Sequence, residues 1–165
     1  MSADVTSPAA PLAWIFTANT QLLVKAFDDV GDDQLWHRPS QQNNPILWIA
    51  GHMVGTRALI LQLLGDAYDT GWGPQFGRGA VLGHESTYPS KDEVLRVHRE
   101  VAARLQAKLH TLSLEDLARE VTAGPKPFGV KTVGEQLGFL AMHDSYHLGQ
   151  VAYVRKALGL SGLVG

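Results

Sequence analysis

The sequence reads TVGEQLGFLAMHDSYHLGQVAYVRKALGL over residues 132–160, a pattern typical of one long helix. Thr132 followed by Glu135 predicts a capping box at its start. Apolar residues then recur at helical spacing, and His143 and His147 lie four residues apart on the same apolar face. An unpaired polar group in a core costs roughly 1 to 3 kcal/mol, so two imidazoles on this face need partners.

Three further segments carry apolar residues at helical spacing and are expected to be helices: residues 11–30, 45–65 and 90–112. The second of these segments should begin near Pro45, with Asn44 as its cap, and end at Gly65. The third should begin at Ser90, with Glu93 completing a capping box. No window alternates convincingly at a period of two, so no sheet is expected.

A glycine-rich segment separates the second helix from the third. Residues 66–89 contain five glycines and two prolines, which excludes a regular helix. Fully extended, this segment spans on the order of 80 Å, whereas the second helix is only about 30 Å long. The segment can therefore return along the bundle, so that the third helix lies parallel to the second. The predicted fold is an all-α four-helix bundle with a long crossover loop between helices two and three.

Composition is that of a globular chain. Its 165 residues are 45% hydrophobic and 18% charged, which predicts a single domain over residues 1–165, with about 1–10 as a flexible leader. The net charge is -2 without a basic cluster, so neither nucleic acid nor an anionic membrane is an expected partner. No apolar run reaches about 18 residues and no signal peptide is recognisable, so a cytoplasmic location is expected. The absence of cysteine excludes disulfides, thiolate metal ligands and a cysteine nucleophile.

A third histidine lies on the second helix. His52 is the one titratable residue on the stripe predicted to be buried there, which continues to Leu59. Gly51 and Gly55 flank it and would let another helix approach closely. Three imidazoles from two helices can bind one divalent ion at about 2.0 to 2.1 Å and leave a coordination position open, as catalytic sites do. Imidazole ligands suit Zn, Ni, Fe or Cu. The alternative is that these histidines only hydrogen-bond to the backbone or to one another.

The remaining histidines are weaker candidates for ligands. His98 and His110 are expected on a solvated face of the third helix, and His37 lies in a loop. His84, in the crossover segment, is the one rival ligand. Asp144 follows His143 directly but should point about 100° away from the histidine face.

Two groups are expected at the open side of the site. Gln150 lies on the histidine face, and its amide is a candidate catalytic group that orients water or substrate, although a plain hydrogen-bonding role is equally open. The crossover segment should pass over the site, with Trp72, Phe76 and Tyr88 as walls and Arg78 as a contact for an anion.

Two stretches of the sequence resemble the DinB-like (YfiT-like) superfamily of metal-dependent enzymes: WIAGHMVGTR on the second helix and HDSYHLGQVAYVRKALGL on the fourth. The resemblance runs from about residue 12 to residue 160. It implies a four-helix bundle with a long crossover, a homodimer, and one divalent metal ion held by His52, His143 and His147. Characterised members of the superfamily include thiol-dependent S-transferases and a thiol-dependent isomerase.

Three hypotheses for function follow from these residues. In the first, the metal activates a small thiol for S-transfer, and the thiol arrives as a cosubstrate because the chain has no cysteine. In the second, the same site activates water for hydrolysis. No carboxylate lies clearly on the histidine face as a general base, which favours the thiol. The third is a non-catalytic metal-binding stress-response bundle, whose site would be sealed from solvent. The net charge makes DNA binding the weakest possibility.

A homodimer is the expected assembly. Trp14 and Phe16 on the first helix, with Tyr153 and Val154 on the fourth, provide more apolar residues than a single core face needs. Bundles of this size often bury such a face in a twofold contact. The expected ligand of the site is a small molecule.

Overall fold

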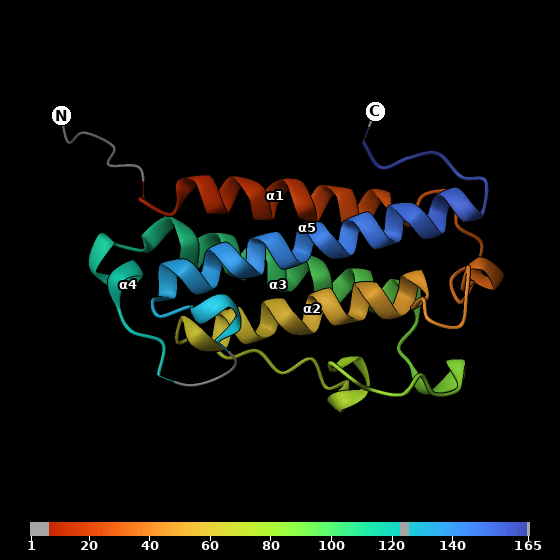
Figure 1. Cartoon of the computed structure of the whole chain (residues 1–165), viewed down its shortest axis with the longest axis horizontal. Helices are drawn as coiled ribbons and strands as arrows, with labels where there is room; N and C mark the ends of the chain where they lie inside the picture. The colour runs from red at the N-terminus through yellow and green to blue at the C-terminus, as the bar shows by residue number, and fades with distance from the viewer. Residues whose placement is uncertain (1–6, 123–125, 165) are drawn as a thin grey trace.

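The computed structural model describes residues 7–122 and 126–164. Within them the chain is helical and has no β-strand, which confirms the all-α prediction. Four long helices form the bundle (Figure 1): α1 (Ala10–Lys25), α2 (Ile46–Leu63), α3 (Lys91–Thr111) and α5 (Val133–Ala157). Helices α1 and α2 each pack against both α3 and α5, so the predicted four-helix bundle is confirmed.

Short helices occupy the connections: α4 (Leu114–Ala118), η1 (Asp32–Gln34), η2 (Gly73–Phe76), η3 (Glu85–Thr87) and η4 (Pro127–Gly129). Helix α4 and the single turn η4 join α3 to α5, while η2 and η3 lie within the crossover segment. The crossover segment is therefore not a regular helix, as predicted, but it contains two short turns of 3₁₀ helix.

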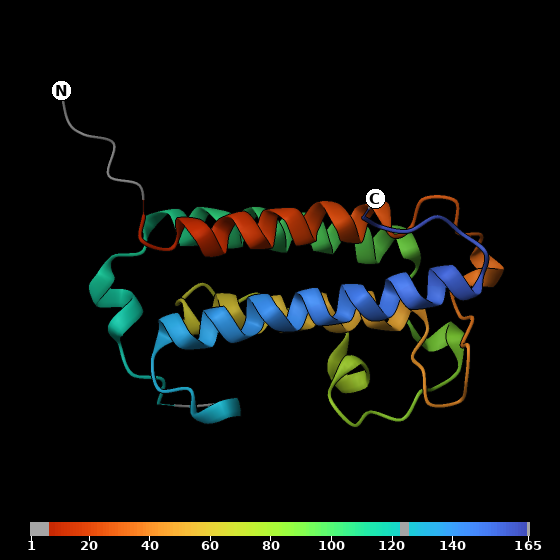
Figure 2. The same cartoon turned by 45° about the horizontal axis from the view of Figure 1, so that its top comes forward.

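The crossover segment, residues 66–89, returns along the bundle from the end of α2 to the start of α3 (Figure 2). Helices α2 and α3 consequently run in the same direction, opposite to α1 and α5 (Figure 1). Gly71, Gly73 and Gly79 have φ of +71°, +64° and +79°, a conformation that glycine adopts without steric cost. The predicted parallel arrangement of the second and third helices is confirmed.

The predicted caps are confirmed at α5 and only in part at α3. Thr132 Oγ1 accepts a hydrogen bond from Glu135 N, and the Glu135 carboxylate accepts one from Thr132 N, which completes the capping box. Ser90 Oγ accepts from Glu93 N at 3.2 Å. The Glu93 carboxylate, however, pairs with Arg96 at 2.9 Å and does not return to Ser90, so the second box was predicted wrongly.

Helix α2 begins at Ile46, and Pro45 occupies its N-cap position in place of Asn44. The reason is that Pro45 has ψ of 159°, which is extended backbone and lies outside the helix. Leu59, predicted on the buried stripe, is 63% exposed. It lies two turns beyond His52 on a side of α2 that is open, because a Cβ added at Gly55 would meet no atom within 4 Å.

Part of the predicted leader is packed against the bundle. Residues 1–6 lie outside the described part of the chain. The Ser7 hydroxyl contacts the carbonyl oxygens of Leu109 and Leu112 at 2.7 and 3.0 Å, and Ala9 is fully buried. Residues 7–10 are therefore anchored to the end of α3 and to the start of α1.

Helix α2 also has the length and hydropathy of a membrane-spanning helix, with a mean hydropathy of 1.4 over Ile46–Leu63. The prediction that no segment is long and apolar enough to span a membrane was therefore wrong. However, 72% of this window is buried inside the bundle. The hydropathy of α2 is therefore explained by its place in the core of the domain.

The core is made of aliphatic side chains from all four long helices. Leu23, Ile49, Leu105 and Leu137 come from α1, α2, α3 and α5 in turn, and all are buried. Burying a side chain of this kind contributes about 1.5 to 3 kcal/mol. The bundle therefore has a source of stability that does not depend on a bound ion.

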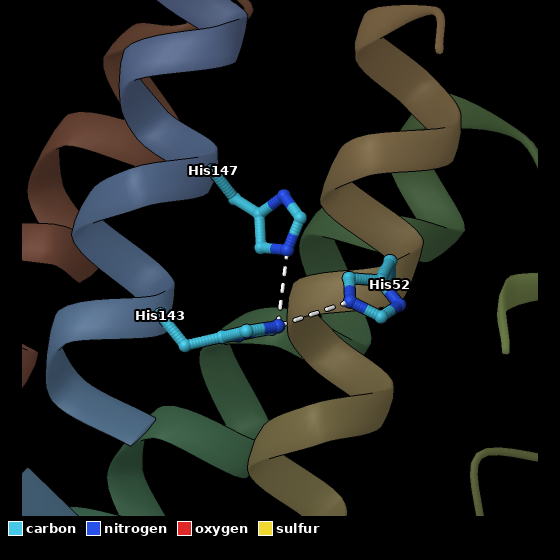
Figure 3. Close-up of side chains that lie close together, drawn as sticks. All are labelled: His52, His143 and His147. Atoms are coloured by element: carbon cyan, nitrogen blue, oxygen red, sulfur yellow. Dashed lines mark hydrogen bonds between the residues drawn. The ribbon is translucent and has the colours of Figure 1, made fainter. Parts of the chain in front are cut away.

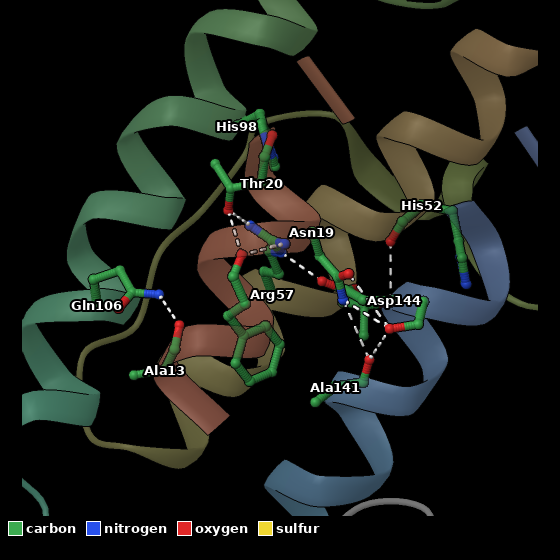
Figure 4. Close-up of polar contacts among 12 residues, drawn as sticks. Ala13, Asn19, Thr20, His52, Arg57, His98, Gln106, Ala141 and Asp144 are labelled. Carbon is green, nitrogen blue, oxygen red and sulfur yellow. Dashed lines mark hydrogen bonds and ion pairs between the residues drawn. The ribbon is translucent and has the colours of Figure 1, made fainter. Parts of the chain in front are cut away.

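A buried ion pair crosses the core beside the histidines. Arg57 Nε donates to Asp144 Oδ2 at 2.8 Å, and both side chains are fully buried. Arg57 also donates to Thr20 Oγ1 at 2.6 Å and to Phe16 O at 3.4 Å, so it connects α1, α2 and α5 (Figure 4). Burial raises the pKa of the Asp144 carboxyl, and the Arg57 guanidinium opposes that rise.

His98 is completely buried, so its predicted position on a solvated face was wrong. Its Nε2 donates to Thr20 O at 3.4 Å, and its Nδ1 has no partner among the described residues. The spacing explains the burial, because His98 lies four residues after Val94 and three before Val101, on the apolar stripe of α3.

Candidate metal centre

Three histidines meet between α2 and α5 (Figure 3). His52 comes from the first half of α2, and His143 and His147 come from successive turns of α5. His143 Nε2 lies 3.3 Å from His52 Nε2 and 3.0 Å from His147 Nε2. The structure therefore brings together the three residues that the sequence predicted as ligands, and all three are half-buried.

Oxygen acceptors fix the tautomer of two of the rings. His52 Nδ1 donates to the carbonyl oxygen of Phe76 at 2.7 Å. His147 Nδ1 donates to the amide oxygen of Gln150, also at 2.7 Å. A neutral imidazole has one proton, so the Nε2 atoms of His52 and His147 both carry lone pairs that face the cluster. This arrangement, in which a second partner orients a ligand ring, is usual around protein-bound metals.

The number of protons in the cluster favours a cation. Of the three Nε2 atoms, only that of His143 can carry a proton. Its N–H bond can be directed at His52 Nε2 or at His147 Nε2, but not at both. Nitrogens at about 2.1 Å from one ion in a tetrahedral arrangement are roughly 3.4 Å apart, close to the two separations found here. The residues present therefore fit a single divalent ion. The remaining proton of His143 would then lie on Nδ1, which is buried and has no partner among the described residues.

Burial keeps two of these rings neutral. Loss of solvation lowers the pKa of His143 to about 4, and the neighbouring His52 contributes in the same direction. Loss of solvation also lowers the pKa of His147 to about 4, with a further contribution from His143. At pH 7 both rings are neutral, so each has one nitrogen lone pair available to a cation.

The crossover segment covers one side of the cluster. Trp48 stacks on His52, with ring centroids 5.2 Å apart and planes 6° from parallel, and Trp48 Nε1 donates to Gln75 O at 3.0 Å. Phe76 is buried, and its ring contacts those of Trp72 and Tyr88 at centroid distances of 5.4 and 5.2 Å. The three predicted aromatic residues are thus brought together beside the site, with Phe76 at their centre.

The role of the glycines on α2 differs from the prediction. A Cβ added at Gly51 would lie only 2.3 Å from the ring of Phe76. Gly51 therefore admits a side chain of the crossover segment and not another helix. No element packs closely against Gly55, because a Cβ added there would have no atom within 4 Å.

The other predicted residues lie away from the cluster or act indirectly. His84 is exposed, and its Nδ1 bonds to Ser86 at the start of η3, so it does not join the three histidines. Arg78 is also exposed, and nothing in the structure assigns it an anion. His110 is exposed at the end of α3, as predicted. Gln150 makes a hydrogen bond, since its amide oxygen accepts from His147 Nδ1, and its role in orienting water or substrate stays a prediction.

Two features of the site were not predicted from the sequence. The first is the ion pair of Arg57 and Asp144. The sequence does indicate that Asp144 is buried, because it lies at helical spacing on the stripe that contains Leu137, Ala141 and Leu148. The second is the carbonyl group of Phe76, which bonds to His52. The sequence cannot indicate this contact, because every residue has a carbonyl group and the position of this one depends on the path of the crossover segment.

The fold and the cluster define a class of protein: an all-α four-helix bundle with three converging histidines suited to one divalent ion. The chain belongs to the DinB superfamily, whose sequence profile matches residues 15–151. The resemblance recognised in the sequence is therefore confirmed. No curated protein matches the chain in sequence.

Solved structures show the same fold at low sequence identity. YfiT from Bacillus subtilis, described as a probable metal-dependent hydrolase with an unusual four-helix bundle topology, is 16% identical with a TM-score of 0.71. The match covers 93% of this chain and 89% of YfiT. A conserved protein from Enterococcus faecalis is 13% identical with a TM-score of 0.74, covering 94% of this chain and 99% of that one.

Proposed function

We propose that this protein is a metal-dependent enzyme whose divalent ion is held by His52, His143 and His147. The observation that carries the proposal is the convergence of three Nε2 atoms that share at most one proton. The description of YfiT as a probable metal-dependent hydrolase supports the same class of activity. Zn, Ni or Fe is the expected ion, because neutral imidazole ligands suit all three.

The favoured reaction is transfer of a small thiol, as in a thiol-dependent S-transferase. A divalent ion bound here would lower the pKa of a coordinated thiol or water, so that the anion forms near neutral pH. Among the described residues, no Asp or Glu belongs to the histidine group. Asp144 is the nearest carboxylate in sequence, and it is buried in the pair with Arg57. The lack of a general base favours a thiol, which ionises more readily than water.

Gln150 is the proposed contact for the substrate. Its amide oxygen accepts from His147 Nδ1, which leaves the two hydrogens of its NH₂ group as donors. Gln150 is exposed, so these donors can reach a small molecule beside the cluster. We therefore expect it to orient the substrate and to hold His147 in place at the same time.

Two alternative functions would use the same site. A metal-dependent hydrolase would use water in place of the thiol, as the description of YfiT suggests. A non-catalytic metal-binding bundle would need a site sealed from solvent. The half-buried histidines and the open space beside Gly55 favour an accessible site and therefore an enzyme.

We further propose that the enzyme acts in the cytoplasm as a homodimer on a small molecule, with neither nucleic acid nor membrane as a partner. The small net charge of -2 supports this set of partners. Trp14 and Tyr153 are exposed and available for a dimer contact, whereas Phe16 and Val154 are buried in the core and cannot contribute to it.

The test combines metal analysis with two activity assays on protein purified without a histidine tag. Elemental analysis should find about one divalent ion per chain in the wild type and in the His110→Ala control, and much less in His143→Ala. Consumption of low-molecular-weight thiols with an electrophile such as a chloronitrobenzene would support the transferase. Ester cleavage without thiol would support the hydrolase. A wild-type protein that binds no divalent ion at neutral pH overturns the proposal.

A further inference from the structure

We propose that residues 74–77 of the crossover segment form a strap that positions His52 for the metal, and that Gly51 is the residue that lets this strap dock. The inference rests on the proposed metal function, because it concerns the affinity of the same site. It assigns a role to Gly51, which has no side chain and is not itself a proposed ligand.

The strap holds two side chains of α2 through consecutive carbonyl groups. Gln75 O accepts from Trp48 Nε1 at 3.0 Å, and Phe76 O accepts from His52 Nδ1 at 2.7 Å. Trp48 and His52 are one helical turn apart and their rings stack. Two carbonyls of the strap thereby fix two stacked rings, one of which is a predicted ligand.

Gly51 lies between these two rings in sequence and faces the strap. The ring of Phe76 lies so close to α2 that a Cβ at Gly51 would be 2.3 Å from one ring carbon and 2.4 Å from the next. The ring has little freedom to move aside, because it also contacts Trp48, Trp72 and Tyr88 at centroid distances of 6.4, 5.4 and 5.2 Å. Any side chain at Gly51 must therefore displace the strap.

Displacement of the strap removes the acceptor of His52 Nδ1. The imidazole then loses the hydrogen bond that selects its tautomer, and its Nε2 lone pair is no longer held toward His143. Loss of such a partner to a ligand typically lowers metal affinity 10- to 100-fold. The coupling is reciprocal, so a bound ion must also favour the docked strap by the same factor.

The chain supplies a matched control for a substitution at Gly51. Gly51 and Gly55 are both in α2, one turn apart, and neither has a positive φ. Alanine is the better helix former at both positions. Only Gly51→Ala meets the Phe76 ring, because the Cβ position of Gly55 has no atom within 4 Å.

The first measurement is affinity for Zn²⁺ and Ni²⁺, determined by competition with a chelating dye. Gly51→Ala should bind about 10- to 100-fold more weakly than wild type, and Gly55→Ala should bind within about twofold of it, since it disturbs no partner of a ligand. Equal affinity of Gly51→Ala and wild type overturns the inference. If the wild type binds neither ion, the proposed function fails, and the second measurement decides on the strap alone.

The second measurement is the rate of trypsin cleavage after Arg78, the one Lys or Arg within residues 66–89. Cleavage requires local opening of the segment. In metal-free protein, Gly51→Ala should be cut faster than wild type and Gly55→Ala, as followed by mass spectrometry of the fragments 1–78 and 79–165. Added Zn²⁺ should slow the cut in the wild type. Equal rates for Gly51→Ala and wild type without metal would show that the strap does not depend on Gly51.

A double variant keeps the inference testable if Gly51→Ala loses its helical circular dichroism. In Gly51→Ala/Phe76→Ala the added Cβ has no ring to displace, so it should bind Zn²⁺ as tightly as Phe76→Ala alone. This is the non-additivity expected of two residues in contact. A further loss of affinity in the double variant overturns the role assigned to Gly51.

Discussion

Each of the histidines between the helices takes its role from the groups that face its two ring nitrogens. His52 and His147 each have one oxygen acceptor on Nδ1, and this leaves Nε2 free to face a cation. His98 instead has a carbonyl on Nε2 and no partner for Nδ1 among the described residues. The same type of side chain is thus a candidate metal ligand on α2 and α5 and a packed core residue on α3.

At the residue scale, we predict that His98 makes the protein sensitive to acid. Burial, followed by the charge of Arg57, lowers the pKa of His98 from 6.5 to about 3. The unfolded chain therefore binds a proton between these pH values and the folded chain does not, so stability falls as the pH falls. The loss is about 1.4 kcal/mol for each pH unit below 6.5, and it ends near the folded pKa.

Thermal unfolding at pH 7 and pH 4.5 measures this effect. His98→Leu, which places an apolar side chain of similar size in the core, should show a smaller difference in Tm between the two values than wild type. His110→Leu, at an exposed position, should leave the difference unchanged. Equal pH dependence of His98→Leu and wild type would contradict the prediction.

The convergence of the three histidines could be predicted from the sequence because each occupied an apolar stripe with no other polar partner in view. His98 also lies at helical spacing from Val94 and Val101 on the apolar stripe of α3. It was predicted to be solvated because its neighbours in the sequence are charged. The position of each histidine therefore followed from the apolar stripe on which it lies, and the prediction failed for His98 on α3, whose opposite face is charged.

At the scale of the helices, the ion pair of Arg57 and Asp144 joins three elements at one point. We predict that Arg57→Met lowers the free energy of unfolding by roughly 3 to 5 kcal/mol, because it leaves the Asp144 carboxylate buried without a counter-ion. The Thr20 and Phe16 contacts on α1 are lost in the same variant. Chemical denaturation followed by circular dichroism gives the value.

The double variant Arg57→Met/Asp144→Leu provides the control. It replaces both charges by apolar groups, so its loss should be smaller than the loss from Arg57→Met alone. A double variant that is less stable than both single variants would show that the ion pair itself, and not the avoidance of an unpaired charge, supports the packing of α1, α2 and α5.

Helix positions were predictable because apolar spacing and caps are local properties. The start of α5 followed from Thr132 and Glu135, whereas α3 kept Ser90 as a cap but used Glu93 for a pair with Arg96. For the crossover segment, chain length was enough to predict its direction. Its contact with His52 was not predictable, because that contact uses a backbone carbonyl whose place depends on tertiary packing.

At the scale of the whole molecule, we predict that a chelator lowers Tm without unfolding the bundle. An ion that binds only the folded form at about 100 times its Kd adds roughly 2.7 kcal/mol, which for a chain of this size corresponds to a Tm about 5 to 10 °C higher. The aliphatic core should keep the chelated protein helical. Calorimetry and circular dichroism with and without chelator test both parts, and a chelated protein without helical signal would contradict the second.

The proposed dimer predicts a mass near twice 17.9 kDa in light scattering. Trp14 and Tyr153 are 71% and 58% exposed, so Trp14→Glu/Tyr153→Glu should place charges in the contact and give the mass of one chain. Leu114→Glu is the control, since Leu114 is 75% exposed but lies on α4, which is not one of the two helices of the proposed contact. A wild-type mass of one chain at micromolar concentration would exclude the homodimer.

The histidines lie far apart along the chain, and this affects how the protein is made. His52 precedes His143 by 91 residues. During synthesis on the ribosome, α1, α2 and the crossover segment emerge with only one of the three clustered imidazoles, that of His52, because His143 and His147 lie on α5. The proposed centre would form only after α5 has been translated and has docked against α1 and α2. Acquisition of the proposed ion is therefore expected late in biogenesis, and truncated chains that lack α5 are expected not to assemble the three-histidine centre.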